Sequence, residues 1–423
     1  MQTAAPRRSQ QEDDSMSDIR IGIIGTGLIS NRHMRVWGKI PGVQIVAACD
    51  VHEKRLAEWG QRYGVAPENL YRNYKDLLAR DDIDAVDVCV HNNLHMPLSI
   101  AVMRAGKHCY CEKPMAGSYA DGKRMYDAQA VYGKKLAIQI SSIMNSQTRI
   151  AKKMVEGGEL GDIYHIRSVG ERRLGRPAVD MRGAFQPEFY SAEYAGHGAL
   201  FDIGVYHLSQ LLYVAGLPEL ESVYGAAYTA VDIDPRLLQG RKFEVEDLGV
   251  GMARYKGGIT MDILESWAIN MDEIGKTFIA GSKGGLKFEG VDAYGGKLAL
   301  DPTGPFQPKM PQLYYYGTDR YGNMVDVDLK VQENERHEEN RDAGIRIYND
   351  NQLHWLAYLK GELTDETRYN TPYIALQALL VSEGIFLSQK LGRSVTKDEI
   401  EAMSVSTAIQ RQTTDWGVLE YDF

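Results

Sequence analysis

The sequence predicts an α/β domain with a parallel sheet, followed by an α+β region rich in antiparallel strands. In the first third of the chain, short apolar runs alternate with segments of helical periodicity. Near-continuous apolar strands of this kind belong to a parallel sheet that is covered on both faces. Later the pattern changes to two-residue alternation interrupted by glycine turns, as in 252–263 and 280–288. The chain of 423 residues is long enough for two or three domains.

The elements of the first region follow from apolar periodicity and from the residues at their ends. Segment 28–40 has apolar and aromatic residues at helical spacing, and Pro41-Gly42 would end that helix. Segment 53–63 is expected to form a helix that ends at Gly64. Further helices are expected at 97–106 and 119–133. Strands are expected at 19–25, 43–49, 83–90, 107–111 and 136–141.

The composition excludes several classes of partner. A net charge of −9 without a basic stripe argues against nucleic acid and anionic membranes. The four cysteines lie in apolar strand-like runs without metal-ligand spacing, so we expect reduced thiols in a cytoplasmic protein and no metal site. They are Cys49, Cys89, Cys109 and Cys111. Residues 1–18 are polar and aperiodic, and we expect a disordered tail there.

The first strand-to-helix turn carries a phosphate-binding pattern. Gly25 to Ser30 reads "GTGLIS", which is G-x-G-x-x-G with serine in the third place. It leaves a strand and opens a helix in a βαβ unit, the context that indicates dinucleotide binding. Gly25 would permit the tight turn, and Gly27 would let the backbone approach a pyrophosphate. The amides of Leu28 and Ile29 would then point at that pyrophosphate from the helix N-terminus.

Asp50 ends the second expected strand and indicates which dinucleotide is bound. A carboxylate at this place accepts hydrogen bonds from the ribose diol and repels a 2′-phosphate. We therefore expect NAD in preference to NADP. His52, Lys54 and Arg55 lie close in sequence and would be able to receive a phosphate, and a plain helix-capping role for Asp50 is the alternative.

Three further segments match a known family. They are "VCVHNNLH" (88–95), "AGKHCYCEKPMA" (105–116) and "GHGALFDIGVYHLSQLLYVAG" (196–216). Together they resemble the Gfo/Idh/MocA oxidoreductases, which include glucose–fructose oxidoreductase and inositol dehydrogenases. The resemblance implies a Rossmann domain followed by an α+β domain with a large, mostly antiparallel open sheet. We expect the NAD-binding domain at 19–145 and the substrate and oligomerisation domain at 146–423.

The resemblance also assigns roles near the end of strand 107–111. Lys113 would lie beside the nicotinamide ring and meet the substrate hydroxyl, and its bond to Pro114 is often cis in the family. Glu112 and Lys113 belong to the family's E-K-P turn, and Asn92 and His95 match its run on the nicotinamide side. We therefore expect all four residues to contact the cofactor.

The acid/base group is assigned by the same resemblance. The family residue lies four positions after the aspartate of the D-I-G helix, and that position is Tyr206 when the aspartate is Asp202. Residues four apart share a helix face, so Tyr206 and Asp202 would point the same way. His207, one position later, is the alternative acid/base group or a hydrogen-bonded histidine behind the site. Lys113, Asp202 and His207 are the expected substrate contacts.

Three functions remain open from the sequence. The first is an NAD-dependent dehydrogenase acting on a secondary alcohol of a sugar, glycoside or cyclitol. The second is an NAD-dependent glycoside hydrolase that oxidises C3 transiently and eliminates the aglycone, with His207 or His197 as the extra base. The third is a non-catalytic NAD-dependent regulator, against which an intact Lys113, Asp202 and Tyr206 set argues.

Assembly is the last expectation. An open sheet needs a cover, which in the family is usually another subunit, so we expect a homo-oligomer, either a dimer or a tetramer. The tyrosine-rich segment 313–321 is expected to form an extended excursion at the surface or at a subunit contact. The charge run 332–342 is expected to be a solvated loop or helix face, and 171–197 either a substrate-binding loop or a structural one.

Overall fold

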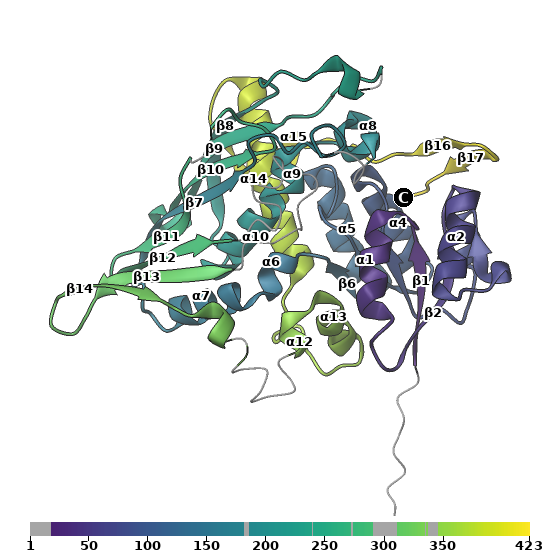
Figure 1. Ribbon diagram of the computed structural model, residues 1–423, viewed down its shortest axis with the longest axis horizontal. Coiled ribbons are helices and arrows are strands. Elements are labelled where there is room, and N and C mark those ends of the chain that lie inside the picture. The colour runs from purple at the N-terminus through teal and green to yellow at the C-terminus, as the bar shows by residue number, and fades with distance from the viewer. Residues whose placement is uncertain are drawn as a thin grey trace, which may run out of the picture.

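The computed structural model describes residues 18–181, 186–238, 240–271, 274–290, 311–334, 336 and 346–423. A Rossmann domain and a domain built on a large sheet lie next to each other (Figure 1). The expected tail at 1–18 falls almost entirely outside the described residues, as does most of the charge run at 332–342.

The Rossmann domain contains a six-stranded sheet in the order β3-β2-β1-β4-β5-β6, with every pair parallel. Its strands are β1 (Ile19–Ile24), β2 (Val43–Cys49), β3 (Leu70–Tyr71), β4 (Ala85–Val88), β5 (His108–Cys111) and β6 (Leu136–Ile138). Ile23 packs in one apolar core and the next residue, Ile24, in another. The sheet is therefore buried on both faces, which confirms the prediction from near-continuous apolar strands.

The helices of this domain are α1 (Leu28–Trp37), α2 (Glu53–Tyr63), α3 (Tyr74–Leu78), α4 (Asn92–Arg104) and α5 (Tyr119–Tyr132). Helix α4 begins earlier than expected, and Pro97 lies inside it. A proline cannot donate the backbone hydrogen bond that the Asn93 carbonyl would otherwise receive. The Ile409 amide donates to that carbonyl instead, at 3.0 Å. Ile409, near the C-terminus, thus supplies the hydrogen-bond donor that Pro97 lacks.

The second domain contains a nine-stranded sheet in the order β14-β13-β12-β11-β7-β10-β9-β8-β15. Its strands are β7 (Ile163–Glu171), β8 (Leu220–Tyr228), β9 (Leu248–Tyr255), β10 (Thr260–Ser266), β11 (Thr277–Gly281), β12 (Gly284–Glu289), β13 (Gln312–Thr318), β14 (Met324–Asp328) and β15 (Val395–Thr396). Strands β7 and β10 are parallel and the other described pairs are antiparallel. The large, mostly antiparallel sheet is confirmed.

The tyrosine-rich segment 313–321 is extended, as expected, and lies toward one edge of the large sheet, while its part in a subunit contact stays a prediction. Tyr314 and Tyr316 belong to β13, which pairs with β12 on one side and β14 on the other. Tyrosine has a high strand propensity, and the run of three consecutive tyrosines suits a partly buried strand. Leu313, which precedes them in β13, is fully buried, whereas Tyr316 is 37% exposed.

Helices cover one face of the large sheet. Further α-helices among the described residues include α6 (Ser141–Met144), α7 (Ser146–Glu156), α8 (Ala192–Ala195), α9 (Ala199–Asp202), α10 (Gly204–Val214), α12 (Arg346–Asn349), α13 (Asn351–Leu359), α14 (Thr371–Leu391) and α15 (Lys397–Met403). Helix α10 packs against β7, and α14 against β8 and β9. Along β10, Met261 and Ile263 are buried while Thr260 and Asp262 are partly exposed, so the sheet alternates between the covered face and the open face.

Helix α14 is long and apolar enough to span a membrane by length and composition alone. Within its apolar window, however, 72% of the residues are buried in the protein. It contacts α5, α10 and β8. These contacts identify it as a core helix between the two domains, which can be followed in yellow in Figure 1.

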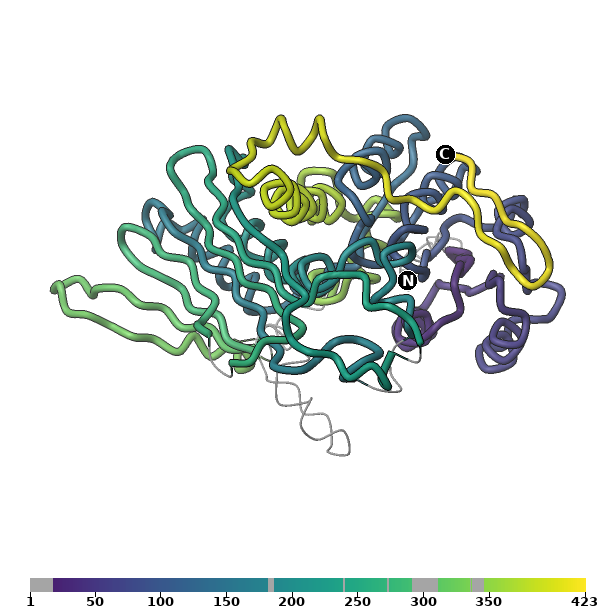
Figure 2. The backbone as a smooth tube through the Cα atoms, turned by 90° about the horizontal axis from the view of Figure 1, so that it is seen from above, coloured from purple at the N-terminus to yellow at the C-terminus, as the bar shows by residue number. Residues whose placement is uncertain are grey.

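The C-terminal segment crosses back to the Rossmann domain, as the yellow tube in Figure 2 shows. It ends in a hairpin of β16 (Arg411–Thr414) and β17 (Gly417–Glu420). Tyr421 stacks on Tyr74 at a ring distance of 5.5 Å, and Lys75 pairs with Asp422 at 3.0 Å. The two domains are therefore tied together at a second place, away from their sheets.

Candidate active site

Lys113 follows β5, at the carboxyl end of the parallel sheet where ligands of such sheets bind. Its bond to Pro114 is cis, as the family resemblance implies. The turn is held from behind by two contacts. His95 Nδ1 lies 2.7 Å from the Pro114 carbonyl oxygen, and the Glu112 carboxylate accepts a hydrogen bond from the Lys113 amide at 2.9 Å. The lysine side chain thus leaves the strand end from a fixed backbone.

The Lys113 ammonium binds Asp202, which ends α9 in the second domain. Its Nζ donates to Asp202 Oδ1 at 2.7 Å and to the Asp202 carbonyl oxygen at 2.9 Å. The lysine and aspartate side chains are 13% and 16% exposed. Burial by itself would lower the pKa of Lys113, but the Asp202 carboxylate outweighs it and raises that pKa above its ordinary value. The lysine is therefore charged, and the ion pair joins the two domains.

Two residues that the sequence did not single out complete this cluster. Trp267 follows β10, and its Nε1 donates to Asp202 Oδ2 at 3.0 Å. Burial would raise the pKa of Asp202, but the charges of Lys113 and Arg172 and the two hydrogen bonds lower it. Arg172 belongs to the segment 171–197 that was open between two roles. We call Lys113, Asp202, Tyr206, Trp267 and Arg172 the Lys113 cluster.

Tyr206 faces the lysine, although the helix that carries it differs from the expectation. The Lys113 ammonium lies 4.6 Å from the centre of the Tyr206 ring, within the range of a cation–π contact. Asp202 ends α9 and Gly204 begins α10, with Ile203 between them at the break. The single helix expected from the D-I-G motif was wrong, yet both residues still meet at Lys113.

His207 points away from Lys113, into the large sheet. Its Nδ1 lies 2.9 Å from Glu265 Oε2 on β10, and Ser168 on β7 donates to Glu265 Oε1 at 2.7 Å. His207 is 2% exposed and Glu265 is fully buried. We call these three residues the His207 cluster. The expected substrate contact by His207 is corrected, because its ring is packed behind α10 and hydrogen-bonded there.

The glycine-rich turn fits a dinucleotide. Gly25 has φ +93°, and a Cβ there would lie 2.2 Å from the Cys89 carbonyl oxygen, so only glycine is accommodated. A Cβ on Gly27 would meet nothing within 4 Å, which leaves open space over the turn. Among the described residues, no side chain caps the start of α1 at Leu28, and Leu28 is 53% exposed. The first-turn amides of α1, including that of Ile29, are thus placed for a pyrophosphate.

Asp50 is more heavily hydrogen-bonded than expected. It accepts from the Thr26 amide at 2.8 Å, the His52 amide at 2.9 Å and the Arg55 guanidinium at 2.6 and 3.0 Å. Burial would raise the pKa of Asp50, but these partners lower it. The Arg55 side chain is 44% exposed. Asp50 is therefore ionised at the end of β2, and its charged partner is the long, partly exposed side chain of Arg55.

Three expected cofactor contacts have other partners in the structure. Asn92 donates to the Ala195 carbonyl of α8 at 2.9 Å. His95 is fully buried and holds the Lys-Pro turn. Glu112 is 6% exposed and binds His33 at 2.7 Å. The side chains of His95 and Glu112 thus bind groups of the protein around the Lys113 turn, and the cofactor contacts expected of all three residues stay predictions.

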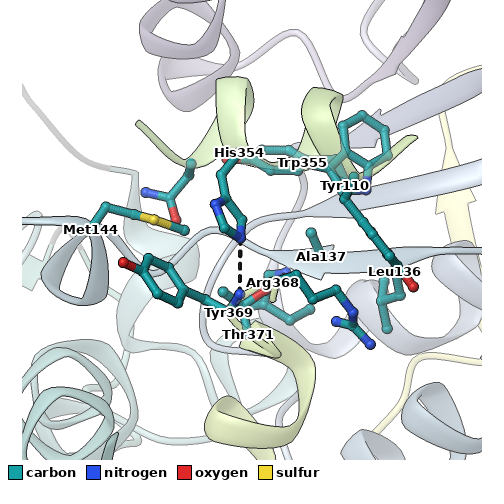
Figure 3. Close-up of a pocket in the computed structure, with 12 residues that line it drawn as sticks. Tyr110, Leu136, Ala137, Met144, His354, Trp355, Arg368, Tyr369 and Thr371 are labelled. Carbon is teal, nitrogen blue, oxygen red and sulfur yellow. Dashed lines mark hydrogen bonds between the residues drawn. The ribbon is translucent and has the colours of Figure 1, made fainter. Parts of the chain in front are cut away.

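A small pocket lies elsewhere, between β6, α13 and the start of α14 (Figure 3). His354 and Trp355 are among its lining residues, and Lys113, Asp202 and Tyr206 are not. His354 Nε2 accepts the Tyr369 amide at 2.9 Å, and its ring stacks on the Tyr369 ring. This pocket belongs to the packing of the Rossmann domain and is separate from the Lys113 cluster.

Comparison with known proteins places this geometry in a family. A family model described as "Oxidoreductase family, NAD-binding Rossmann fold" matches residues 19–140, and the GFO/IDH/MocA C-terminal domain matches residues 148–287. The chain belongs to the Gfo/Idh/MocA oxidoreductase family. NAD is the cofactor of its Rossmann domain, in agreement with the turn at Gly27 and the carboxylate of Asp50.

Curated members of the Gfo/Idh/MocA family resemble the chain over part of its length. D-glucoside 3-dehydrogenase of Escherichia coli is 27% identical over 61% of this chain and 72% of its own length. Myo-inositol 2-dehydrogenase of Thermotoga maritima is 29% identical over 57% and 66%. Levoglucosan dehydrogenase of Pseudarthrobacter phenanthrenivorans is 28% identical over 48% and 52%. For the latter two, the match covers less than two thirds of the relative.

Solved structures share the Gfo/Idh/MocA fold over nearly the whole chain. The aldose–aldose oxidoreductase of Caulobacter crescentus has a TM-score of 0.64 and 23% identity, covering 90% of this chain and 99% of that one. Levoglucosan dehydrogenase in complex with NADH has a TM-score of 0.66 and 20% identity, covering 89% and 98%. At these identities the likeness establishes the fold.

Proposed function

We propose that the chain is an NAD-dependent dehydrogenase acting on a secondary alcohol of a sugar, glycoside or cyclitol. The observation that carries this proposal is the charged Lys113, pinned by Asp202 at the carboxyl end of β5 and faced by Tyr206. A lysine in this place can bind a hydroxyl oxygen beside a nicotinamide ring. The names of the curated relatives support this class of substrate.

Three residues of the Lys113 cluster, Lys113, Tyr206 and Asp202, have roles in this proposal. Bound NAD would accept the hydride from the carbinol carbon, so the substrate is oxidised to a ketone. The hydroxyl proton would pass to the Tyr206 oxygen. An ordinary tyrosine has a pKa of about 10, and the Lys113 ammonium beside the ring favours the phenolate that must accept this proton. Asp202 holds the lysine or accepts from a neighbouring substrate hydroxyl.

Asp50 is proposed to select NAD over NADP. Its carboxylate would exchange the exposed Arg55 for the ribose diol, and it would repel a 2′-phosphate. Asp50→Ser should narrow the ratio of kcat/KM for NAD over NADP, because it removes the repulsion. Arg55→Ala should widen that ratio, because it removes the cation nearest to the carboxylate. Better use of NADP by the unaltered protein would contradict the assignment.

The hydrolase alternative needs a further base, and the geometry offers little support for one. His207 is buried behind α10 on Glu265. His197 lies between the rings of Phe201 and Phe386, at 4.3 and 4.2 Å, and burial lowers its pKa to about 4. A stacked, weakly basic imidazole is a poor candidate for removing the proton next to a ketone.

One assay separates the three functions. The purified protein is mixed with NAD and a panel of free sugars, cyclitols and aryl glycosides, and both NADH and released aglycone are measured. The proposal expects stoichiometric NADH with a keto product. Aglycone without net NADH would identify a hydrolase, and NAD binding without either product would identify a regulator.

We further propose that the protein is a cytoplasmic homo-oligomer, a dimer or tetramer, joined through the open face of the large sheet. Tyr224 on β8 and Met252 on β9 are register partners there, and they are 58% and 47% exposed. Exposed apolar side chains in a contiguous row are typical of a protein–protein interface. Light scattering at micromolar concentration should give an oligomer, and Met252→Glu should reduce its mass. A monomer of the unaltered chain would contradict this proposal.

A further inference from the structure

A buried histidine lies beneath the Lys113 turn, on the dinucleotide helix itself. His33 is on α1, and its side chain is 3% exposed. Its Nδ1 lies 2.8 Å from Asp87 Oδ2 on β4, and its Nε2 lies 2.7 Å from Glu112 Oε1. Asp87 is fully buried and Glu112 nearly so. The imidazole thus bridges two carboxylates that have almost no access to water.

Hydrogen-bond counting determines what this bridge requires. An ionised carboxylate only accepts hydrogen bonds, and a neutral imidazole can donate through only one of its nitrogens. Both short contacts are satisfied together when His33 donates from both nitrogens. Burial by itself would lower the pKa of His33, but the charge of Asp87 and its hydrogen bond outweigh this and raise that pKa well above its ordinary value. Geometry and electrostatics therefore agree on an imidazolium.

The neighbours of the bridge are also fixed. Trp37 Nε1 donates to Asp87 Oδ2 at 2.7 Å, and the Cys89 thiol donates to Asp87 Oδ1 at 3.3 Å. His33, Asp87 and Cys89 place three donor atoms within 4.8 Å of one another, a spacing that would suit a metal ion. Burial raises the pKa of the Cys89 thiol, and all three side chains are already engaged in hydrogen bonds. The set is therefore better described as a hydrogen-bonded network than as a cation site.

Glu112 connects the His33 bridge to the candidate active site. One oxygen of this carboxylate binds His33, and the other accepts the Lys113 amide at 2.9 Å. Glu112 has few ways to move, because both oxygens have short partners on different elements. The chain of contacts therefore runs from β4 through α1 to the backbone of the lysine that faces Asp202.

We propose that His33 is a positioning residue: by donating to Asp87 and Glu112 at once, it fixes the Glu112 carboxylate and thereby the backbone from which Lys113 reaches the substrate. The role rests on the proposed dehydrogenase function. Under this proposal, α1 has a second role besides dinucleotide binding. The helix that would hold the pyrophosphate at Leu28 also sets the lysine beside the nicotinamide, so the two ends of the cofactor site share one rigid element.

The test compares two buried histidines that are both hydrogen-bonded through both nitrogens. His33→Gln removes the bridge. His354→Gln is the matched control, because His354 binds the Ile347 carbonyl and the Tyr369 amide in the pocket of Figure 3, outside the candidate site. Both changes should lower the melting temperature. His33→Gln should lower kcat about 10- to 100-fold with KM for NAD changed less than about 3-fold, since a small misplacement of a reacting group is enough for such a loss. His354→Gln should leave kcat unchanged.

A spectroscopic readout keeps the inference testable without any substrate. In the full chain labelled with ¹⁵N-histidine, one imidazole should show both nitrogens protonated at pH 8, and His33→Gln should remove that signal. If His33 carries a single ring proton, the inference is overturned even when the dehydrogenase assay succeeds. It is also overturned when kcat is unchanged in His33→Gln, or falls equally in His354→Gln. Failure of the dehydrogenase assay with the imidazolium signal present would count against the proposed function and leave the bridge established.

Discussion

The Lys113 cluster and the His207 cluster both hold a basic side chain against a carboxylate, on different sides of α10. Lys113 and Asp202 keep 13% and 16% of their side chains exposed, whereas His207 and Glu265 are buried in the sheet. Tyr206 and His207 are adjacent in sequence, yet one faces the lysine and the other faces β10. The two clusters therefore differ in solvent exposure rather than in residue type, and solvent exposure distinguishes the proposed catalytic cluster from the supporting one.

Removing the lysine should have the largest effect on turnover. Lys113→Ala deletes the charge that lies over the Tyr206 ring and that we propose to bind the substrate hydroxyl, so kcat should fall about 10³-fold, within the range for groups that take part in proton transfer. The affinity for NAD, measured by fluorescence titration, should stay within a few-fold. Lys123→Ala is the control, because Lys123 pairs with Asp127 on the exposed face of α5. Normal turnover in Lys113→Ala would remove the basis of the account.

Neutralising the aspartate should have a smaller effect, with a signature in pH. Asp202→Asn keeps an acceptor for Trp267 but removes the charge that raises the pKa of Lys113. That pKa should therefore fall, and the alkaline limb of the kcat profile should move to lower pH. We expect kcat at neutral pH to fall about 10- to 100-fold, because the lysine is no longer held in place. An unshifted alkaline limb would show that Asp202 does not set the lysine charge.

Much of the Lys113 cluster was predictable from the sequence, because two short motifs contain most of its residues. The E-K-P turn and the D-I-G segment identified Lys113, Asp202 and Tyr206. Trp267 and Arg172 were missed because they follow β10 and β7, two strands that are far apart in the sequence. Only the folded sheet brings the ends of these strands together, where the Arg172 amide donates to the Ser266 carbonyl. A tryptophan directly after an alternating strand was the available signal.

The sequence was less informative about which side chains face the cofactor. His95, Glu112 and His207 have the residue types of a reactive site, but burial turned each toward a structural partner. Five of the six described strands of the Rossmann domain were predicted within a few residues, because continuous apolar runs are a strong signal, whereas the two-residue strand β3 was missed. The helix break at Ile203 had no local signal, since Gly204 is ordinary within the motif.

Disturbing the His207 cluster should affect stability and spare the chemistry. A Cβ on Gly170 would lie 2.1 Å from Glu265 Oε2 and 2.6 Å from the His207 ring, so Gly170→Ala forces the pair apart. The free energy of unfolding should fall by about 1–3 kcal/mol, the usual cost of overpacking or of a lost buried hydrogen bond. The kcat of the folded enzyme should change less than about 3-fold. A tenfold loss of kcat with unchanged stability would assign the cluster a chemical role.

The last stability effect concerns Glu246, which binds the start of α9, the helix that ends at Asp202 of the Lys113 cluster. Its carboxylate accepts from the Gly198 and Leu200 amides at 2.7 and 2.9 Å, and burial raises its pKa to about 7. The folded protein then binds this proton more tightly than the unfolded chain, whose value is about 4.3. Stability should therefore decline as pH rises from about 4.3 to about 7. Glu246→Gln should flatten that decline in thermal unfolding, and an unchanged slope would contradict it.

The most direct test of the comparison sets Tyr206→Phe against His207→Gln in one dehydrogenase assay, with the same sugar and with folded protein verified for both. The account predicts that Tyr206→Phe lowers kcat about 10²- to 10⁴-fold, because the proton acceptor is lost. His207→Gln should keep kcat within about 3-fold at full NAD saturation, since the His207 ring is hydrogen-bonded to Glu265 on the side of α10 that faces the sheet. An inactive His207→Gln beside an active Tyr206→Phe would contradict the account and assign the proton transfer to the histidine.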